Sequence, residues 1–306
     1  MKDKIMSMDY YDCIIVGGSY SGLSAAMALG RSLRKVLVID DGKPCNATTP
    51  HSQNFITHDG KKPAEIAAIA KQQVEQYKSI SFYKGLATKG RKLDEGFEIE
   101  TKSGEKLRSK KLIFATGIRD IMPAIPGFSV CWGISVIHCP YCHGYEYREK
   151  KTAVMANGDL AFHFTPLIYN LTKDLVLITG GKSTLTNEQT VKLKEHNITI
   201  VEKEIAEVKH KEGYLEEVIF NDGSKIPLQA LYAKPLFEQH SDIPVALGCE
   251  ITEQGYIKID NMQKTTVPGI FACGDNSSFM RSVANAVSSG NMAGAATNKE
   301  LSEMEF

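Results

Sequence analysis

Long apolar stretches are missing from this 306-residue chain, and no run approaches the roughly 20 residues that a membrane-spanning helix needs. An excess of one charge is missing as well, because 36 Lys and Arg residues balance 36 Asp and Glu residues. Without a net field, no general attraction to nucleic acid or anionic lipid is expected. The sequence therefore predicts neither a membrane protein nor a nucleic-acid-binding protein.

The N-terminal segment "MKDKIMSMDYYDC" lacks the apolar core of a signal peptide. We therefore expect a cytoplasmic protein, in a reducing compartment where its 7 cysteines do not build a structural disulfide framework. An isolated C-x-x-C in that compartment is typical of a catalytic or a metal-binding site. The length of the chain predicts two domains.

The segment 10–42 predicts a strand, a glycine turn, a helix and a second strand. Apolar residues 13–16 indicate a buried strand, and residues 35–39 indicate another that closes on an acid. A strand–helix–strand unit of this size is the framework of a dinucleotide-binding domain. The segment therefore predicts the start of a Rossmann-like domain.

Small residues occupy the three positions of the dinucleotide fingerprint in that unit. Gly17 permits the tight turn, Ser19 is small enough for a pyrophosphate to approach the backbone, and Gly22 lets the helix lie close to the sheet. Ser19 departs from the usual glycine. Asp40, about 20 residues further on, is expected to hydrogen-bond a ribose hydroxyl. The alternatives are a glycine turn without a ligand and an exposed acid at a strand end.

A second strand–turn–helix–strand pattern covers residues 152–181, and its fingerprint is incomplete. Ala156, Gly158 and Ala161 stand at the three positions, so the glycine of the tight turn is missing. After the strand at 175–179 there is neither an arginine pair for a 2′-phosphate nor an acid for a 2′-hydroxyl. We expect a second Rossmann-like domain in which NAD(P)H binding is doubtful.

Two proline-containing segments, "IRDIMPAIPGF" and "AKPLFEQHSDIPVALG", have the composition of linkers. After the second, "GYIKID" and "VPGIFACGD" predict strands, and Ser282–Lys299 predicts a terminal helix. The expected fold class is α/β, with two Rossmann-like (three-layer ββα) dinucleotide-binding domains, the second inserted into the first. The first would comprise residues 1–120 and 244–306, and the second residues 121–243.

The segment "HCPYCH", residues 138–143, allows several readings. C-x-x-C-H is formally the haem attachment signature, but that modification normally requires export. Four zinc donors packed this tightly cannot surround one tetrahedral ion, and the chain has no second pair. "CPYC" is also the glutaredoxin motif, which lies early in a small domain of its own. A redox-active disulfide is favoured, because two cysteines three apart at a helix start can pair and the helix end lowers the thiolate pKa.

The order of motifs resembles the low-molecular-weight thioredoxin reductases, which are FAD-dependent pyridine-nucleotide–disulfide oxidoreductases. The chain carries a FAD-type strand–helix–strand unit, an "ATG" strand, a middle C-x-x-C, a second dinucleotide-type domain and a late "GIFACGD" before a helix. "CPYCHGYE" and the loop ending in "HDG" are more similar to the gliotoxin- and holomycin-type dithiol oxidases. These share the fold but oxidise a small-molecule dithiol and pass electrons from flavin to oxygen.

The resemblance implies FAD as the cofactor. The residues that it places along FAD are Gly17, Ser19, Gly22, Asp40, Asn54, Thr116, Gly117, Gly274, Asp275 and Val283. Val283 would begin the helix whose positive end faces the flavin, where a reduced anionic ring is stabilised. The resemblance also implies that Cys142 faces the flavin and that Cys139 exchanges with the substrate. His143 is a candidate acid/base, because imidazole exchanges protons near pH 7. Its alternative role is a hydrogen-bonded residue of the first helical turn.

We therefore expect a FAD-dependent thiol–disulfide oxidoreductase that uses Cys139 and Cys142 to oxidise a small-molecule dithiol, with oxygen re-oxidising the flavin. One alternative is a thioredoxin reductase-type enzyme that reduces a thioredoxin-like protein with electrons from NAD(P)H or ferredoxin. Another is a flavin-bearing redox sensor with little turnover. The resemblance implies a homodimer, and no metal site is expected.

Overall fold

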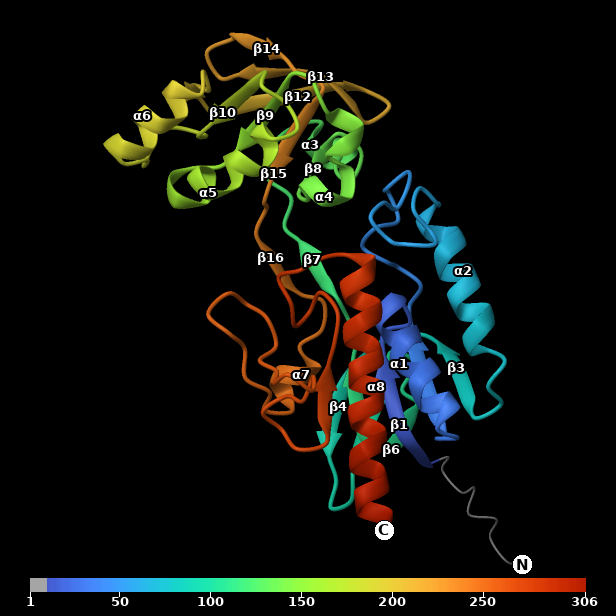
Figure 1. Ribbon diagram of the computed structural model, residues 1–306. Helices are drawn as coiled ribbons and strands as arrows, with labels where there is room; N and C mark the ends of the chain where they lie inside the picture. Colours follow the sequence, from blue (N-terminus) through green and yellow to red (C-terminus); the bar gives the residue numbers. More distant parts are fainter. Residues whose placement is uncertain (1–9) are drawn as a thin grey trace, which may run out of the picture. The chain divides into compact units, whose positions relative to one another are not determined.

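The computed structural model describes residues 10–306, and its contacts divide the chain into two compact units (Figure 1). Unit 1 holds the described residues up to 47, together with 64–119 and 237–306. Unit 2 holds residues 48–63 and 120–236. Residues 48–63, expected in the first domain, thus group with unit 2. Most of the segment inspected for a signal peptide lies outside the described residues.

Unit 1 is built on a seven-stranded sheet in the order β3-β2-β1-β6-β5-β4, with β17 paired to β6. Its parallel strands are β1 (Tyr10–Val16), β2 (Val36–Asp40), β3 (Ile80–Lys84), β6 (Lys106–Phe114) and β17 (Ile270–Ala272). Two antiparallel strands, β4 (Ala87–Lys92) and β5 (Phe97–Thr101), extend it. Val16 is level with both Ile39 and Phe114, so the carboxyl ends of β1, β2 and β6 meet at one edge.

Alternate residues of the central strand β1 pack in two hydrophobic cores, one on each face of this sheet. Cys13 and Ile15 pack toward the helices, whereas Ile14 and Val16 pack toward β4, β5 and the segment around α7 (Ile243–Ala246). The helical layer consists of α1 (Tyr20–Arg31), α2 (Pro63–Val74) and α8 (Val283–Glu305). Burial on both faces explains the continuous apolar runs of β1 and β2.

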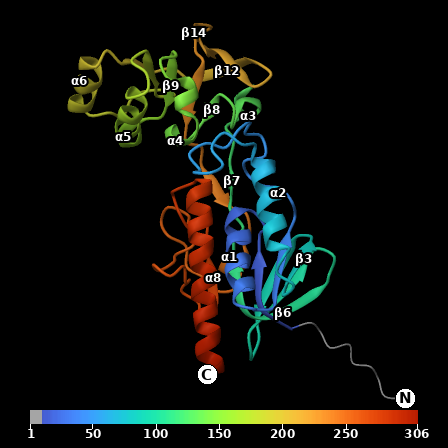
Figure 2. The ribbon, with the colours of Figure 1, turned by 45° about the vertical axis from the view of Figure 1, so that its right-hand side comes forward.

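Helices α1 and α8 lie side by side in both views (Figures 1 and 2). A Cβ on Gly290 would lie 2.1 Å from the Ser21 carbonyl oxygen, and one on Gly294 would lie 2.6 Å from the Ala25 carbonyl oxygen. Both helices therefore run in the same direction, and their N-termini point toward the same edge of the sheet.

Unit 2 contains a five-stranded parallel sheet in the order β11-β10-β9-β15-β8. Its strands are β8 (Val136–Ile137), β9 (Thr152–Met155), β10 (Leu175–Ile178), β11 (Thr199–Val201) and β15 (Ala230–Ala233). One face is covered by α5 (Gly158–Tyr169) and α6 (Asn187–Glu195). The other packs on an antiparallel sheet of β12 (Ile205–Lys211), β13 (Tyr214–Phe220) and β14 (Lys225–Pro227), and on α3 (Phe128–Cys131). The expected α/β class with Rossmann-type sheets is confirmed.

The short elements are α4 (Pro140–His143), the 3-10 turn η1 (Tyr145–Tyr147) and a pair of strands, β7 (Ile118–Asp120) and β16 (Phe237–Gln239). The strand predicted for "GYIKID" is wrong: Ile257 and Ile259 form only isolated bridges, to Ile251 and Thr265. Both partners belong to turning segments, so no continuous ladder forms. Within residues 10–306, no helix is long and apolar enough to cross a membrane.

Candidate functional site

The turn after β1 leaves no room for side chains. Gly17 has a φ of +105°, and a Cβ there would lie 2.2 Å from the Ala115 carbonyl oxygen. A Cβ on Gly22 would lie 1.8 Å from the carbonyl oxygen of Gly17. The backbone of the turn, the first turn of α1 and the end of β6 are therefore in direct contact. Ser19, in extended conformation, is the N-cap of α1.

Asp40 lies at the end of β2 against this turn. The backbone N–H of Gly18 donates to Asp40 Oδ1 at 2.9 Å, and that of Gly42 donates to Oδ2 at 3.1 Å. A Cβ on Gly18 would lie 2.8 Å from the Asp40 Cβ. The carboxylate thus stands at the fingerprint loop, on the side where a ribose would follow a diphosphate bound at the helix.

Buried Asn276 links the end of β6 to the segment after β17. Its Nδ2 donates to the Phe114 carbonyl oxygen at 2.9 Å and to Thr116 Oγ1 at 3.2 Å. Sequence reasoning missed this residue, and the only available signal was its place directly after the Gly-Asp pair. Next to Thr116, Gly117 has a φ of +65° with open space where a Cβ would lie. An uncrowded backbone at a strand end leaves room for a ligand.

Gly274 and Asp275 are held against both helices. The Gly274 N–H donates to Ser289 Oγ at 3.1 Å, and a Cβ on Gly274 would lie 2.6 Å from Ser21 Oγ. Asp275 Oδ2 lies 3.7 Å from Arg281 Nε, and both side chains are largely buried. Arg281, also missed from the sequence, neutralises an acid just before the start of α8.

The N-terminus of α8 projects beyond that of α1. Ser282 caps it by accepting a hydrogen bond from the Asn285 N–H at 3.1 Å. Gly290 is level with Ser21; α8 begins seven residues before Gly290 and α1 one residue before Ser21, so α8 extends about 9 Å further at 1.5 Å per residue. The N-termini of α1 and α8 are both positive helix ends, and one lies further along the site than the other. This arrangement suits a ligand that carries a diphosphate and a second anionic group. This glycine-lined edge fits a dinucleotide such as FAD.

Unit 1 brings together nine of the ten predicted cofactor residues. They are Gly17, Ser19, Gly22, Asp40, Thr116, Gly117, Gly274, Asp275 and Val283. Asn54 belongs to unit 2, where it is exposed with a φ of +57° and its N–H donates to Asp59 Oδ1 at 2.6 Å. Its predicted place beside the flavin stays an expectation from the resemblance.

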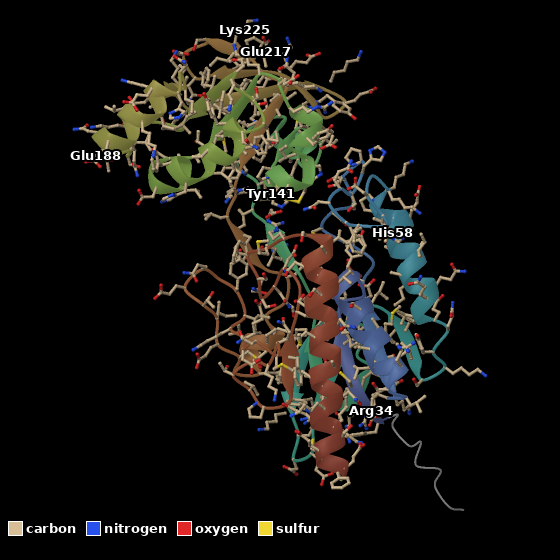
Figure 3. The ribbon with its side chains drawn as sticks, viewed as in Figure 1. Arg34, His58, Tyr141, Glu188, Glu217 and Lys225 are labelled. Atoms are coloured by element: carbon tan, nitrogen blue, oxygen red, sulfur yellow. A yellow bond between two sulfur atoms is a disulfide. The ribbon has the colours of Figure 1, made fainter. Side chains whose placement is uncertain are left out.

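The C-x-x-C lies in unit 2 at the start of α4. Cys139, extended at φ −124° and ψ 114°, is the N-cap, and it forms a disulfide with Cys142. The Cys142 N–H donates to Cys139 Sγ at 3.2 Å. Tyr141, between them, is 67% exposed (Figure 3). Amide donation to Cys139 Sγ would favour the thiolate of Cys139 once the pair is reduced.

His143 ends α4 with both ring nitrogens buried. Within the described chain neither nitrogen has a hydrogen-bond partner, so the alternative of a hydrogen-bonded structural histidine is not realised. Burial lowers its pKa below the usual value, and the charge of Glu146 opposes this shift. The imidazole is therefore neutral at pH 7 and able to accept a proton.

His138 is turned to the other side of the strand. Its ring stacks on Trp132 with a centroid distance of 5.7 Å, and Trp132 stacks on Phe128 at 6.0 Å. This arrangement follows strand alternation, because Ile137 packs in the core under α5 and Val136 packs in the opposite core. His138 therefore lies on the side of the strand opposite to Ile137.

In the second strand–turn–helix unit, the turn before the helix is occupied by side chains of the unit itself. Asn157 Oδ1 accepts hydrogen bonds from the N–H of Gly158 at 2.9 Å and from the N–H of Thr184 at 2.9 Å. Asn157 Nδ2 donates to the Lys182 carbonyl oxygen at 2.9 Å, and a Cβ on Gly158 would lie 2.7 Å from Thr184 Oγ1. Asp159 adds a negative charge to the first turn of α5.

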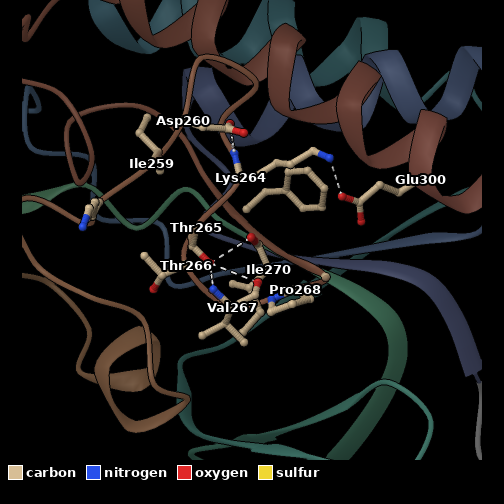
Figure 4. A pocket seen from close by; sticks show the side chains of 12 residues that line it. Ile259, Asp260, Lys264, Thr265, Thr266, Val267, Pro268, Ile270 and Glu300 are labelled. Carbon is tan, nitrogen blue, oxygen red and sulfur yellow. Dashed lines mark hydrogen bonds and ion pairs between the residues drawn. The ribbon is translucent and has the colours of Figure 1, made fainter.

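A surface pocket in unit 1 contains none of the predicted site residues (Figure 4). It is lined by the 258–271 segment and Glu300. Lys264 Nζ lies 2.8 Å from Glu300 Oε1, and Lys111 Nζ lies 2.7 Å from Oε2. The pocket therefore lies where an ion pair joins this segment to α8. Across residues 10–306, no group of three or more His, Cys, Asp or Glu side chains is arranged to hold a metal ion.

The chain belongs to the pyridine nucleotide-disulphide oxidoreductase family, whose model matches residues 11–290. Members of this family bind FAD, and the chain is an enzyme of the thioredoxin reductase-like disulfide oxidoreductases.

The chain is 32% identical over 303 residues to thioredoxin reductase tcpT of Claviceps purpurea (strain 20.1), covering 95% of this chain and 94% of that protein. It is 29% identical to thioredoxin reductase aclD of Aspergillus oryzae (strain ATCC 42149 / RIB 40), covering 97% and 98%. The structure of putative thioredoxin reductase TrxB from Bacillus anthracis superposes with a TM-score of 0.92 at 31% identity, covering 97% and 100%.

Proposed function

We propose that the protein oxidises small-molecule dithiols to disulfides through Cys139 and Cys142, with FAD as its cofactor and dioxygen as the final electron acceptor. The observation that carries the proposal is the pairing of a formed Cys139–Cys142 disulfide with a second nucleotide fold whose turn is closed by Asn157. An enzyme of this family that receives electrons from a dithiol has no need of NAD(P)H.

The exchange begins with a substrate thiolate that attacks Cys139 Sγ. The S–S bond breaks, Cys142 leaves as a thiolate, and a mixed disulfide joins the substrate to Cys139. The second substrate thiol then attacks the substrate sulfur of that bond, which releases the cyclic disulfide and the Cys139 thiolate. Two electrons pass to the cysteine pair, and the two substrate protons are released. Neutral His143 is suited to accept one of them.

The residues that would hold FAD are those of unit 1. The α1 turn with Gly17 and Gly22 would take the diphosphate, Asp40 the ribose, and the start of α8 at Val283 the anionic end of the flavin. When bound, FAD would accept two electrons from the reduced cysteines and deliver them to dioxygen.

NAD(P)H does not fit the second fold well. The Gly158 amide, which would face a diphosphate, already donates to Asn157 Oδ1. Asp159 in the same turn would repel the phosphates. Thr184 occupies the space next to Gly158. These contacts favour electron entry from a dithiol over entry from NAD(P)H.

Anaerobic mixing of the purified yellow protein tests the proposal. We expect a dithiol such as dithiothreitol to bleach the flavin absorbance rapidly, NADPH to leave it unchanged, and hydrogen peroxide to form when air returns. Rapid bleaching by NADPH would favour the alternative, a reductase of thioredoxin-like proteins. A colourless protein that binds no added FAD would refute both.

A further inference from the structure

Lys234 stands at the carboxyl end of β15, the strand next to β8. The two strands, both labelled in Figure 1, are parallel, and pairing sets Leu231 level with Val136 and Tyr232 level with Ile137. The register ends at Tyr232 and Ile137, so Lys234 and Cys139 each come two residues after the last paired position, and a bend at His138 precedes Cys139. Because neighbouring strands lie about 4.8 Å apart, the chain leaves both strands at the same edge of the sheet.

Tyr232 and Ile137, the last paired residues of the two strands, lie on the same face of the sheet. On β15, Tyr232 packs in the core under α5, and two residues later Lys234 Nζ lies 4.3 Å from the centroid of the Phe164 ring of α5. On β8, Ile137 packs in that same core, and Cys139 follows two residues later in extended conformation. Period-two alternation turns Lys234 to the side of Tyr232, and Cys139 follows the strand that places Ile137 on that side.

Lys234 contributes a positive charge on the α5 side of the sheet. Beside Cys139, α4 contributes His143, whose pKa is lowered by burial, and η1 contributes Glu146. The facing side of α5 is apolar, with Ala161, Phe164 and Ile168 in the core. Lys234 is exposed, and desolvation against that side lowers its pKa.

We propose that Lys234 is a positioning residue whose ammonium group stabilises the Cys139 thiolate and so sets the reactivity of the exchanging sulfur. This inference rests on the proposed exchange at Cys139. It involves no additional redox step, because the cation only favours the deprotonated form of a thiol that the substrate has already produced. An adjacent positive charge favours a thiolate through Coulomb attraction.

The test is the pH profile of Cys139 alkylation in the reduced holoenzyme. Iodoacetamide labelling is followed by peptide mass spectrometry, which separates Cys139 from Cys142. We expect Lys234→Met to raise the midpoint by about one pH unit and to slow labelling at pH 7 about tenfold. Lys234→Arg should stay within about twofold of the wild type, because it keeps the charge.

Lys173→Met is the matched control. Lys173 also places its Nζ over an aromatic ring, that of Tyr169 at 3.7 Å, but it follows the far end of α5. A Lys234→Met profile that superposes on the wild type would overturn the proposal, and so would a raised KM for the dithiol with an unchanged profile. Lys234→Gln replaces Lys234→Met if the latter does not fold. Labelling does not require flavin turnover, so its outcome is separate from that of the bleaching experiment.

Discussion

The carboxylate of Asp40 accepts a hydrogen bond from the Gly18 backbone N–H at 2.9 Å, across the fingerprint turn of unit 1. Asp40 therefore shapes the loop as well as facing the expected ribose. Hydrogen bonds to a charged group contribute about 1.5–3 kcal/mol, so Asp40→Ala should weaken FAD binding roughly 10- to 100-fold. Flavin content after purification and a fluorescence titration of the apoprotein with FAD measure this.

Asp41→Ala is the control for that variant. Asp41 is the next residue, it is exposed, and its ion pair is with Lys43 at 2.7 Å. Its FAD affinity should equal that of the wild type, because exposed ion pairs contribute little. Equal affinity in Asp40→Ala and Asp41→Ala would remove Asp40 from the cofactor site.

Replacing Cys142 by serine should abolish dithiol-driven bleaching of the flavin, because the disulfide that accepts the electrons can no longer form. Stopped-flow absorbance under anaerobic conditions measures the rate. Cys249→Ala, which removes a cysteine outside the disulfide that contacts Thr265 and none of the predicted cofactor residues, should keep it within about twofold. Undiminished bleaching in Cys142→Ser would mean that the dithiol reduces the flavin directly.

The buried ring of His143 should make stability depend on pH. Its folded pKa lies below the unfolded value of 6.5, so the unfolded chain binds more protons between the two values. The stabilisation by neutral His143 is fully present above the unfolded pKa and is lost as pH falls through the folded pKa. Melting temperatures from about pH 8 to about pH 5 should fall less steeply in His143→Gln.

His163→Gln is the control for this pH dependence, because His163 is an exposed residue of α5 in the same unit. Its melting profile should follow the wild type throughout. A His143→Gln profile parallel to the wild type would show that protons taken up elsewhere govern acid stability.

Gly290→Ala should destabilise unit 1, because its Cβ would lie 2.1 Å from the Ser21 carbonyl oxygen where α8 crosses α1. Overpacking of this kind costs about 1–3 kcal/mol and should lower the melting temperature by several degrees. Ser288→Ala, on the exposed side of the same helix, should leave it unchanged. Loss of FAD from the Gly290→Ala variant would follow, because α1 and α8 carry the expected cofactor site.

Much of the architecture can be read from local sequence. The run around Cys13 predicted β1, and the small residues after it predicted the α1 turn, because a tight turn with positive φ and close backbone contact excludes larger side chains. The cysteine pair was expected at a helix start, and α4 begins at Pro140, directly after Cys139. The predicted terminal helix at 282–299 begins as expected and continues to Glu305.

Other features came only from the tertiary structure. Asn276 acquires its function by reaching the Phe114 carbonyl oxygen, and Asn157 by closing its own turn with Thr184. Neither contact has a local signature, because an asparagine amide serves any donor or acceptor that the fold brings to it. The failed strand at "GYIKID" has the same cause: a strand needs a partner, and the neighbouring segments turn away.

The sequence by itself determined the α/β class, the glycine-lined turn and the cysteine pair, because these depend on steric and chemical properties of residues close together in the chain. The tertiary structure alone decided which distant residues share an edge, as with Lys234 and Cys139. The parallel pairing of β8 and β15 brings the ends of both strands to that edge, and it results from burying both faces of the sheet rather than from any motif around either residue.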